Sequence, residues 1–400
     1  MEFPLLDDWD LAIQQLQRLE VHPLGWGDVN IQHTESIILF PELVVLTLVR
    51  TTGYHVLNFI YLSYLFQAGC LLILYRFFLL VAPAGRWTPL DFAPVAIFFL
   101  SWRQSEGLLW GIHLLNTMAL FFSLLALYSC VRAAHFPRFL PMAIASAWIA
   151  SFTMAGGLLV WVAGGAYLAW AARRYLLVWA AAGIACSGCF FADRVSYAED
   201  WPTGAGYVLS HPAAAVHYCL NYLAAPFTHD AGAGPWTGAI VVVLAAIAVY
   251  WAVRDRAARE AAAPGLLLIG LVALALGPLL GRRLGMGPEQ ALASRYVTFS
   301  SLAPIGIYFC LLALLRRRPA ARYLMAALAV LFVAGTFDGY SKGIAEGRES
   351  RKYDLDCAAV VRHYRTVAPE DLECAYPDPR VVLERAPFLE RRHFSLFGER

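Results

Sequence analysis

Charged residues are scarce in this 400-residue sequence: Asp, Glu, Lys and Arg together make up 15%, whereas hydrophobic residues make up 60%. A soluble domain typically contains about 25% charged and about 45–50% apolar residues. The composition therefore excludes an ordinary soluble globular protein. Apolar runs fill most positions between residues 36 and 340. Because a helix needs roughly 20 apolar residues to cross a bilayer, we predict an all-α, polytopic transmembrane helical bundle with about 9–11 membrane segments.

Two other features are missing from the sequence. The net charge is only +2, and no basic patch carries interleaved aromatic residues, so we predict no nucleic-acid partner. Met1 is followed by acidic, amphipathic sequence rather than by the basic start and apolar run of a cleavable signal peptide. We therefore expect the first apolar span to direct membrane insertion.

The charge that is present gathers at the two ends of the chain. Residues 1–35 hold seven carboxylates against one basic residue, Arg18. Residues 341–400 contain eleven Lys or Arg and eleven Asp or Glu, which is typical of a small soluble unit. We predict an acidic extracytoplasmic segment over 1–35, a transmembrane domain over 36–340, and an extracytoplasmic C-terminal tail over 341–400.

Four short basic segments separate apolar runs, and cytoplasmic loops carry an excess of Lys and Arg. Placing all four on the cytoplasmic side leaves the tail outside. The apolar runs 36–49 and 91–101 are too short for an easy crossing, so one of them is expected to be re-entrant or interfacial. The basic segments are Arg132–Arg138, Arg173–Arg174, Arg254–Arg259 and Arg316–Arg318. The expected helices lie near 54–81, 107–130, 139–153, 156–172, 175–192, 235–253, 264–281, 296–315 and 320–338.

The eight cysteines divide into two groups. Cys357 and Cys374 are the only ones in the charged tail, and an extracytoplasmic tail meets an oxidising environment. We therefore predict a disulfide between them. The other six lie in or beside apolar runs. Among these, Cys186 and Cys189 have no His or acidic neighbour, so we interpret them as small apolar packing residues.

Two acidic motifs precede the first apolar run. Asp7 and Asp8 are adjacent, and because neighbouring carboxylates repel, one pKa can rise to suit a general base. The pair can also bind a divalent cation such as Mg²⁺ or Mn²⁺, or simply cap a helix over 11–19. His33 and Glu35 stand at the membrane boundary. They can relay a proton or bind a phosphate-bound metal, or they can act as a polar interfacial anchor.

Two further polar sites interrupt apolar sequence. Arg103, Gln104 and Glu106 lie in a break between two apolar runs, where charged groups normally face a water-filled cavity or the interface. Arg103 can hold a phosphate that Glu106 orients, or the two can pair to close a turn. Arg295 lies against the positive-inside trend, which favours either phosphate recognition or contact with lipid headgroups.

The order of these motifs resembles bacterial multi-pass membrane proteins of the GT-C glycosyltransferase type, several of which are uncharacterised. The resemblance covers most of the chain, although each motif is short. Ser36 and Ile37 stand where the pattern has His and Arg. The matching residues are Asp7–Asp10, Gln32–Glu35, Ser101, Gln104, Glu106, Trp110, Gly111, Ala293–Tyr296, Pro377, Pro379, Leu396 and Phe397.

The resemblance implies a GT-C-like fold and transfer of a sugar from a polyprenyl-phosphate donor on the extracytoplasmic face. The family's acidic base or metal ligand corresponds to Asp7 or Asp8. An enzyme should bring its site residues to one cavity mouth. The rival functions are a non-catalytic carrier or flippase for a lipid-linked saccharide, and a saccharide polymerase. The expected substrate-binding residues are His33, Glu35, Arg103, Gln104, Glu106 and Arg295.

Overall fold

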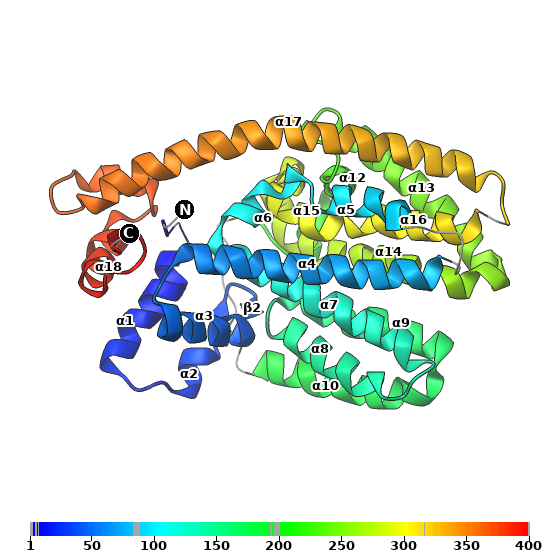
Figure 1. Ribbon diagram of the computed structural model, residues 1–400, viewed down its shortest axis with the longest axis horizontal. Coiled ribbons are helices and arrows are strands. Elements are labelled where there is room, and N and C mark those ends of the chain that lie inside the picture. Colours follow the sequence, from blue (N-terminus) through cyan, green and yellow to red (C-terminus); the bar gives the residue numbers. More distant parts are fainter. Residues whose placement is uncertain are drawn as a thin grey trace.

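The computed structural model describes residues 3–4, 6, 8–82, 89–192, 194–195, 201–315 and 317–398. Most helices run side by side along the long axis of the molecule (Figure 1). Seven helical stretches in this part of the chain are long and apolar enough to cross a membrane, which confirms a multi-pass helical membrane protein. They are Val56–Val81 (α4), Gly111–Ala133 with α7 (Leu114–Ala133), Arg173–Ala192 with α10 (Leu176–Ala192), Gly234–Arg254 (α13), Ala258–Met286 in α14 (Arg256–Arg283) and η7 (Leu284–Met286), Ser294–Leu314 with α15 (Ser294–Ser300) and α16 (Leu302–Leu314), and α17 (Ala321–Arg362).

One of these stretches is central and others are peripheral. The most apolar window of Ser294–Leu314 is 89% buried, whereas the windows in α10 and α17 are only 22% buried. Small residues let α14 approach the central helix closely, because a Cβ added at Gly306 would lie 2.7 Å from the Gly265 carbonyl oxygen. Such backbone contact is how membrane helices gain packing energy without a hydrophobic driving force. The peripheral helices leave apolar faces outward, as a lipid environment requires.

The two short apolar runs do not form regular spans. The run 36–49 lies mainly in α3 (Leu39–Thr52), which is about 21 Å long at 1.5 Å per residue and thus shorter than a bilayer core of about 30 Å. After α4, the chain returns through a series of short helices, which we call the broken segment (residues 89–113). Its pieces are η2 (Pro89–Phe92), α5 (Ala93–Phe99), η3 (Trp102–Gln104), α6 (Ser105–Leu109) and η4 (Gly111–His113). Two more short apolar helices, α8 (Phe139–Ser151) and α9 (Leu159–Ala171), pack beside α7 and α10 (Figure 1).

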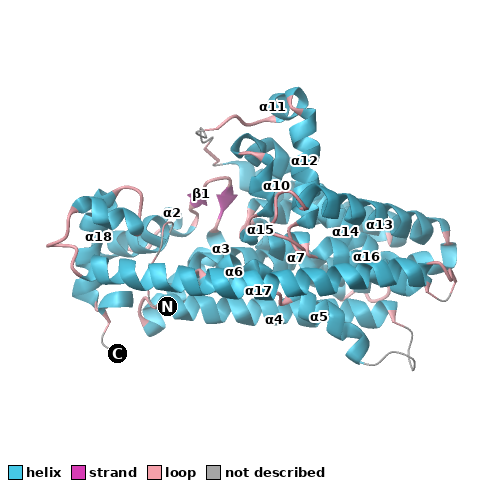
Figure 2. Cartoon of the chain, turned by 90° about the horizontal axis from the view of Figure 1, so that it is seen from above, coloured by secondary structure: helices cyan, strands magenta, loops and turns pink. Residues whose placement is uncertain are grey.

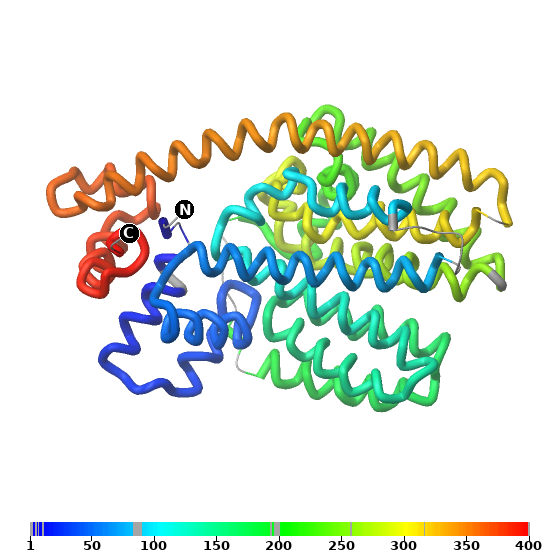
Figure 3. The backbone as a smooth tube through the Cα atoms, in the orientation of Figure 1, coloured from blue at the N-terminus to red at the C-terminus, as the bar shows by residue number. Residues whose placement is uncertain are grey.

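The two ends of the chain fold together into a second hydrophobic core, which we call the terminal cap. Its N-terminal elements meet α18 at the end of the bundle that carries both termini (Figures 1 and 3). Arg385 of α18 donates a 2.6 Å hydrogen bond to the Trp9 carbonyl. A two-stranded hairpin at the same end precedes α3 (Figure 2). The cap elements are η1 (Trp9–Ile13), α1 (Gln14–Val21), α2 (Trp26–Val29), η9 (Pro369–Cys374), α18 (Pro379–Arg392) and η10 (Ser395–Phe397), and the strands of the separate hairpin are β1 (Gln32–His33) and β2 (Ser36–Ile37).

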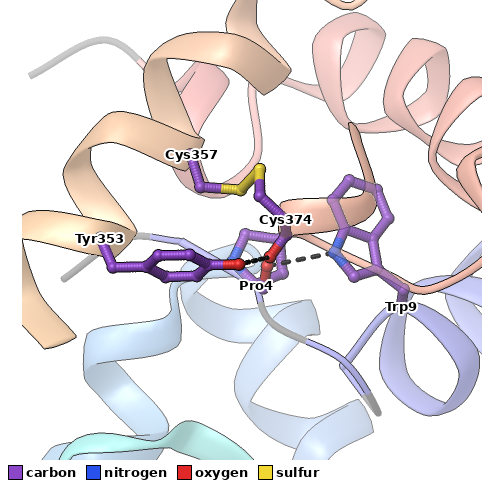
Figure 4. Close-up of a disulfide and its surroundings, with 5 residues drawn as sticks. All are labelled: Pro4, Trp9, Tyr353, Cys357 and Cys374. Carbon is purple, nitrogen blue, oxygen red and sulfur yellow. Dashed lines mark hydrogen bonds between the residues drawn. A yellow bond between two sulfur atoms is a disulfide. The ribbon is translucent and has the colours of Figure 1, made fainter. Parts of the chain in front are cut away.

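A disulfide holds the tail against α17. It joins Cys357, near the C-terminal end of α17, to Cys374 of η9 (Figure 4). The Tyr353 hydroxyl donates a 3.1 Å hydrogen bond to the Cys374 carbonyl. The Trp9 indole donates to the Pro4 carbonyl close by, so the first residues of the chain lie beside the disulfide. This end of the molecule is thereby fixed both covalently and by packing.

The predicted basic segments gather at the other end of the bundle. The connections α7–α8, α9–α10, α13–α14 and α16–α17 all lie away from the terminal cap (Figures 1 and 3). Which end of the bundle faces the cytoplasm is predicted only from the excess of Lys and Arg in cytoplasmic loops.

Candidate functional site

The broken segment brings a buried arginine into the bundle. Arg103 is 1% exposed, and its Nη2 donates hydrogen bonds to the carbonyls of Thr228, at 3.0 Å, and Leu292, at 2.6 Å. The carboxylates of Glu346 and Asp338 on α17 lie near enough to act electrostatically on Arg103. Arg103 therefore ties together three chain segments, and its guanidinium is engaged by backbone carbonyls.

Glycines of α17 make room for this segment. Gly339 and Gly343 follow each other by one helical turn on the face toward η3. A Cβ on Gly339 would lie 2.5 Å from the Ser101 hydroxyl, and one on Gly343 would lie 2.8 Å from the Trp102 carbonyl oxygen. The backbone of η3 therefore rests directly on α17. Because neither glycine has a side chain, η3 packs closely on α17, and the polar residues 103–106 lie within the bundle.

The residues after Arg103 contact the start of α15. Thr298 donates a 3.0 Å hydrogen bond from its hydroxyl to Gln104 Oε1. Arg295 Nη1 lies 3.4 Å from Glu106 Oε1, and both side chains remain about one-third exposed, at 36% and 32%. His113 Nε2 lies 4.0 Å from the same carboxylate oxygen. The broken segment and α15 thus build an ion pair that is half-buried and still open to a ligand.

A second charged group adjoins Arg103 on the α17 side. His229 Nδ1 lies 2.8 Å from Asp338 Oδ2, and its Nε2 lies 3.4 Å from Glu346 Oε2. Lys342 also contacts Asp338, at 2.8 Å. Sequence analysis predicted no role for these residues as a group. The sequence feature that could have indicated them is the run of charged residues that follows position 338, where the last apolar helix was expected to end.

Asp8 lies elsewhere, in the terminal cap, and Asp7 is outside the described residues. Asp8 is 4% exposed and lines a cavity of about 20 Å³ together with Glu42 and Tyr54. Gly111 of η4 lines the same cavity. The single turn η4 therefore contributes to the Asp8 cavity and, through His113, to the Glu106–Arg295 pair. Sequence reasoning missed Glu42, a lone carboxylate inside an apolar run.

His33 and Glu35 belong to a third place, the hairpin. His33 lies in β1, where it pairs in register with Ser36. Glu35 forms an ion pair with Arg282 at the end of α14, and both side chains are less than one-third exposed. The Arg282 carbonyl accepts a 2.7 Å hydrogen bond from the Trp201 indole. Glu35 thus fastens the hairpin to the bundle.

The structure therefore brings Arg103, Gln104, Glu106 and Arg295 together, but it places Asp8 and Glu35 in separate surroundings. Glu106 pairs with Arg295 rather than with Arg103. No group of three or more His, Cys, Asp or Glu side chains in the described part of the chain is arranged to hold a metal ion. Asp7 lies outside the described residues, so the possible Mg²⁺ or Mn²⁺ site at Asp7 and Asp8 stays a prediction.

Comparison with known proteins identifies no relative: no family model, no curated protein and no solved structure matches this chain.

Proposed function

We propose that this chain is a GT-C-like membrane glycosyltransferase that transfers a sugar from a polyprenyl-phosphate donor at the capped end of the bundle. The observation that carries the proposal is the half-buried Glu106–Arg295 pair beside the broken segment. Irregular backbone at membrane depth is tolerated where it is buried in protein or lines a cavity. Ionisable groups in such positions mark substrate pathways by default.

Each residue has a distinct role in this proposal. Arg295 binds the lipid phosphate, for which a guanidinium offers paired donors, and Glu106 orients Arg295 before the ligand arrives. Arg103 and Gln104 position the backbone that carries Glu106. Asp7 or Asp8 deprotonates the acceptor hydroxyl. Glu35 and His33 fix the hairpin at the rim, next to Arg282.

A non-catalytic carrier for a lipid-linked saccharide is the second candidate. The observation that favours it is the burial of Asp8, which is 4% exposed within the cap. A carrier needs Arg295 and an apolar surface for the lipid, but it needs no carboxylate base. The two candidates therefore differ in what the Asp pair does.

The test measures two quantities in membranes that contain the protein: transfer of label from a polyprenyl-phosphate sugar, and binding of the polyprenyl phosphate itself. Replacing both Asp7 and Asp8 by Asn should reduce transfer by about 10²–10⁴-fold and largely spare binding. Arg295→Ala should weaken binding by about 1.5–3 kcal/mol, the contribution of a charge-assisted hydrogen bond.

Arg174→Ala is the matched control, because this exposed arginine lies at the opposite end of the bundle. It should leave both quantities unchanged. Full transfer by the double Asn variant would reject the catalytic role and favour the carrier. Unchanged binding by Arg295→Ala would reject both candidates as they are drawn here.

A further inference from the structure

A small, partly open cavity lies between the N-terminal segment (residues 8–21) and the bundle. Asp8 lines it from the N-terminal side, Glu42 from α3, and Gly111 from η4. Its volume is about 20 Å³, which exceeds the roughly 10–15 Å³ that one water molecule requires. Most of the remaining wall is apolar, with Phe59 and Leu114 among its residues. The cavity therefore holds one water at most, next to two carboxyl groups.

Glu42 is the unusual member of this wall. It is 2% exposed, and its Oε1 has no hydrogen-bond partner in the described part of the chain. Burial raises the pKa of Glu42 to about 7, and the negative charge of Asp28 adds to this effect. A carboxyl group that is buried away from bulk solvent favours its protonated form, because burial costs less for the neutral group than for the charged one.

The groups that face Glu42 from the described part of the chain are mainly acidic or neutral. Asp8 comes from the N-terminal segment, Tyr54 follows α3, and Asp28 lies on α2, where Arg18 pairs with it at 3.9 Å. Arg385 of α18 binds the Trp9 carbonyl and is not among the residues that line the cavity. None of the described lining residues is basic. The ligand that this chemistry selects is therefore a proton, with one water beside it.

We infer that the cavity is a proton-binding site at Glu42, and that the bound proton keeps the N-terminal segment docked on α3 and η4. When Glu42 ionises, its charge stands at a mostly apolar interface where only 2% of the residue is exposed, and the docked state loses stability. This inference stands apart from the proposed transfer reaction, because it requires neither a substrate nor turnover.

The direction of the pH effect follows from linkage. Glu42 of α3 binds its proton more tightly when the N-terminal segment is docked than when it is released, since the ordinary pKa of Glu42 is 4.5 and the docked one is about 7. Docking is therefore strongest below about pH 4.5, weakens as the pH rises toward 7, and levels off above that. Across this interval the docking equilibrium should change by roughly 10²-fold.

The first experiment is infrared difference spectroscopy of the purified full chain in lipid nanodiscs between pH 5 and pH 8. The wild type should show the C=O stretch of a protonated carboxylic acid that disappears with a midpoint near neutral pH. Glu42→Gln should lack this band. Glu349→Gln, at an exposed glutamate of α17, should retain it. A wild type without such a band, or a band that persists in Glu42→Gln, would overturn the assignment.

The second experiment measures docking by amide hydrogen exchange of residues 8–21, corrected for the intrinsic effect of pH, with α8 as the internal reference. Protection of the wild type should fall between pH 5 and pH 8, whereas that of Glu42→Gln should stay constant. This readout needs only the wild type if the variant does not fold. Protection that is independent of pH in the wild type would overturn the inference, as would the same pH dependence in both proteins.

Discussion

Arg103 carries a charge into a position where only 1% of its surface reaches solvent, and two backbone carbonyls accept from it. Burying a charge is costly unless its hydrogen bonds are made, so those contacts are what make the position tolerable. Arg295 is different, because 36% of its side chain is exposed and its partner Glu106 is similarly accessible. Arg103 therefore stabilises the structure, whereas Arg295 is accessible to a ligand.

This difference predicts opposite behaviour for the two arginines. Arg103→Ala should lower the free energy of unfolding by about 1–3 kcal/mol for each carbonyl that loses its donor. Arg295→Ala should change it by about 0–1 kcal/mol, as for an exposed ion pair. Unfolding in detergent, followed by circular dichroism, measures both, and Arg174→Ala is the control. Equal stabilities of the Arg103 and Arg295 variants would contradict the positioning role of Arg103.

Sequence reasoning located most of these residues but not their partners. The polar break at 101–107 between two apolar runs pointed to Arg103, Gln104 and Glu106. The contact between Glu106 and Arg295 joins residues 189 positions apart, and no local periodicity encodes such a distance. Glu42 was not predicted as a site residue, because its apolar neighbours made the run 36–49 resemble part of a membrane span. A single carboxylate in such a run is itself the signal that was available.

At the scale of elements, α17 decides where the broken segment lies. Gly343 and Gly347 are one turn apart on this helix, yet their surroundings differ. A Cβ on Gly343 would meet the Trp102 carbonyl oxygen at 2.8 Å, whereas one on Gly347 would meet only Leu109 Cδ1 at 3.7 Å. The first approach is too close for any real side chain. The second is an ordinary van der Waals contact.

The pair gives a matched substitution test. Gly343→Ala should destabilise the protein by about 1–3 kcal/mol, because η3 must move to accommodate the methyl group. Gly347→Ala should be neutral or stabilising by up to about 1 kcal/mol, since Ala is the better helix former. Thermal unfolding of both variants measures the effect. A stabilised Gly343→Ala protein would show that η3 does not rest on α17 as described.

The elements themselves were predictable where apolar sequence was continuous. The expected helices near 54–81 and 235–253 correspond to α4 and α13. The expected helix near 264–281 begins earlier than predicted, since α14 starts at Arg256 and continues through Pro264. The expected end of the last span near 338 was also wrong, since α17 continues to Arg362. Charged residues such as Glu, Lys and Arg are good helix formers, so loss of hydrophobicity does not end a helix.

At the scale of the whole molecule, the two ends of the sequence build one unit. The acidic segment 1–35 and the charged tail were expected separately, and the structure joins them in a second core with a disulfide beside it. The basic connections lie at the far end of the bundle (Figure 3). The two ends of the long axis therefore differ: one carries the terminal cap and the other carries the basic connections. The broken segment and α15, which supply the Glu106–Arg295 pair, lie nearer the cap (Figure 1).

This polarity makes a prediction about the membrane. Because cytoplasmic loops retain Lys and Arg, the basic end should lie inside and the terminal cap outside. Reporter fusions after Arg174 and Arg318 should read cytoplasmic, and fusions after Gly232 and Gly398 should read extracytoplasmic. The fusion after Gly398 keeps α17 and the disulfide intact, so it tests sidedness without cutting the cap. A cytoplasmic reading there would place Cys357 and Cys374 in a reducing compartment and move the Glu106–Arg295 pair to the cytoplasmic side. The reaction would then have to draw on donors available at that face, and the extracytoplasmic transfer proposed here would fail.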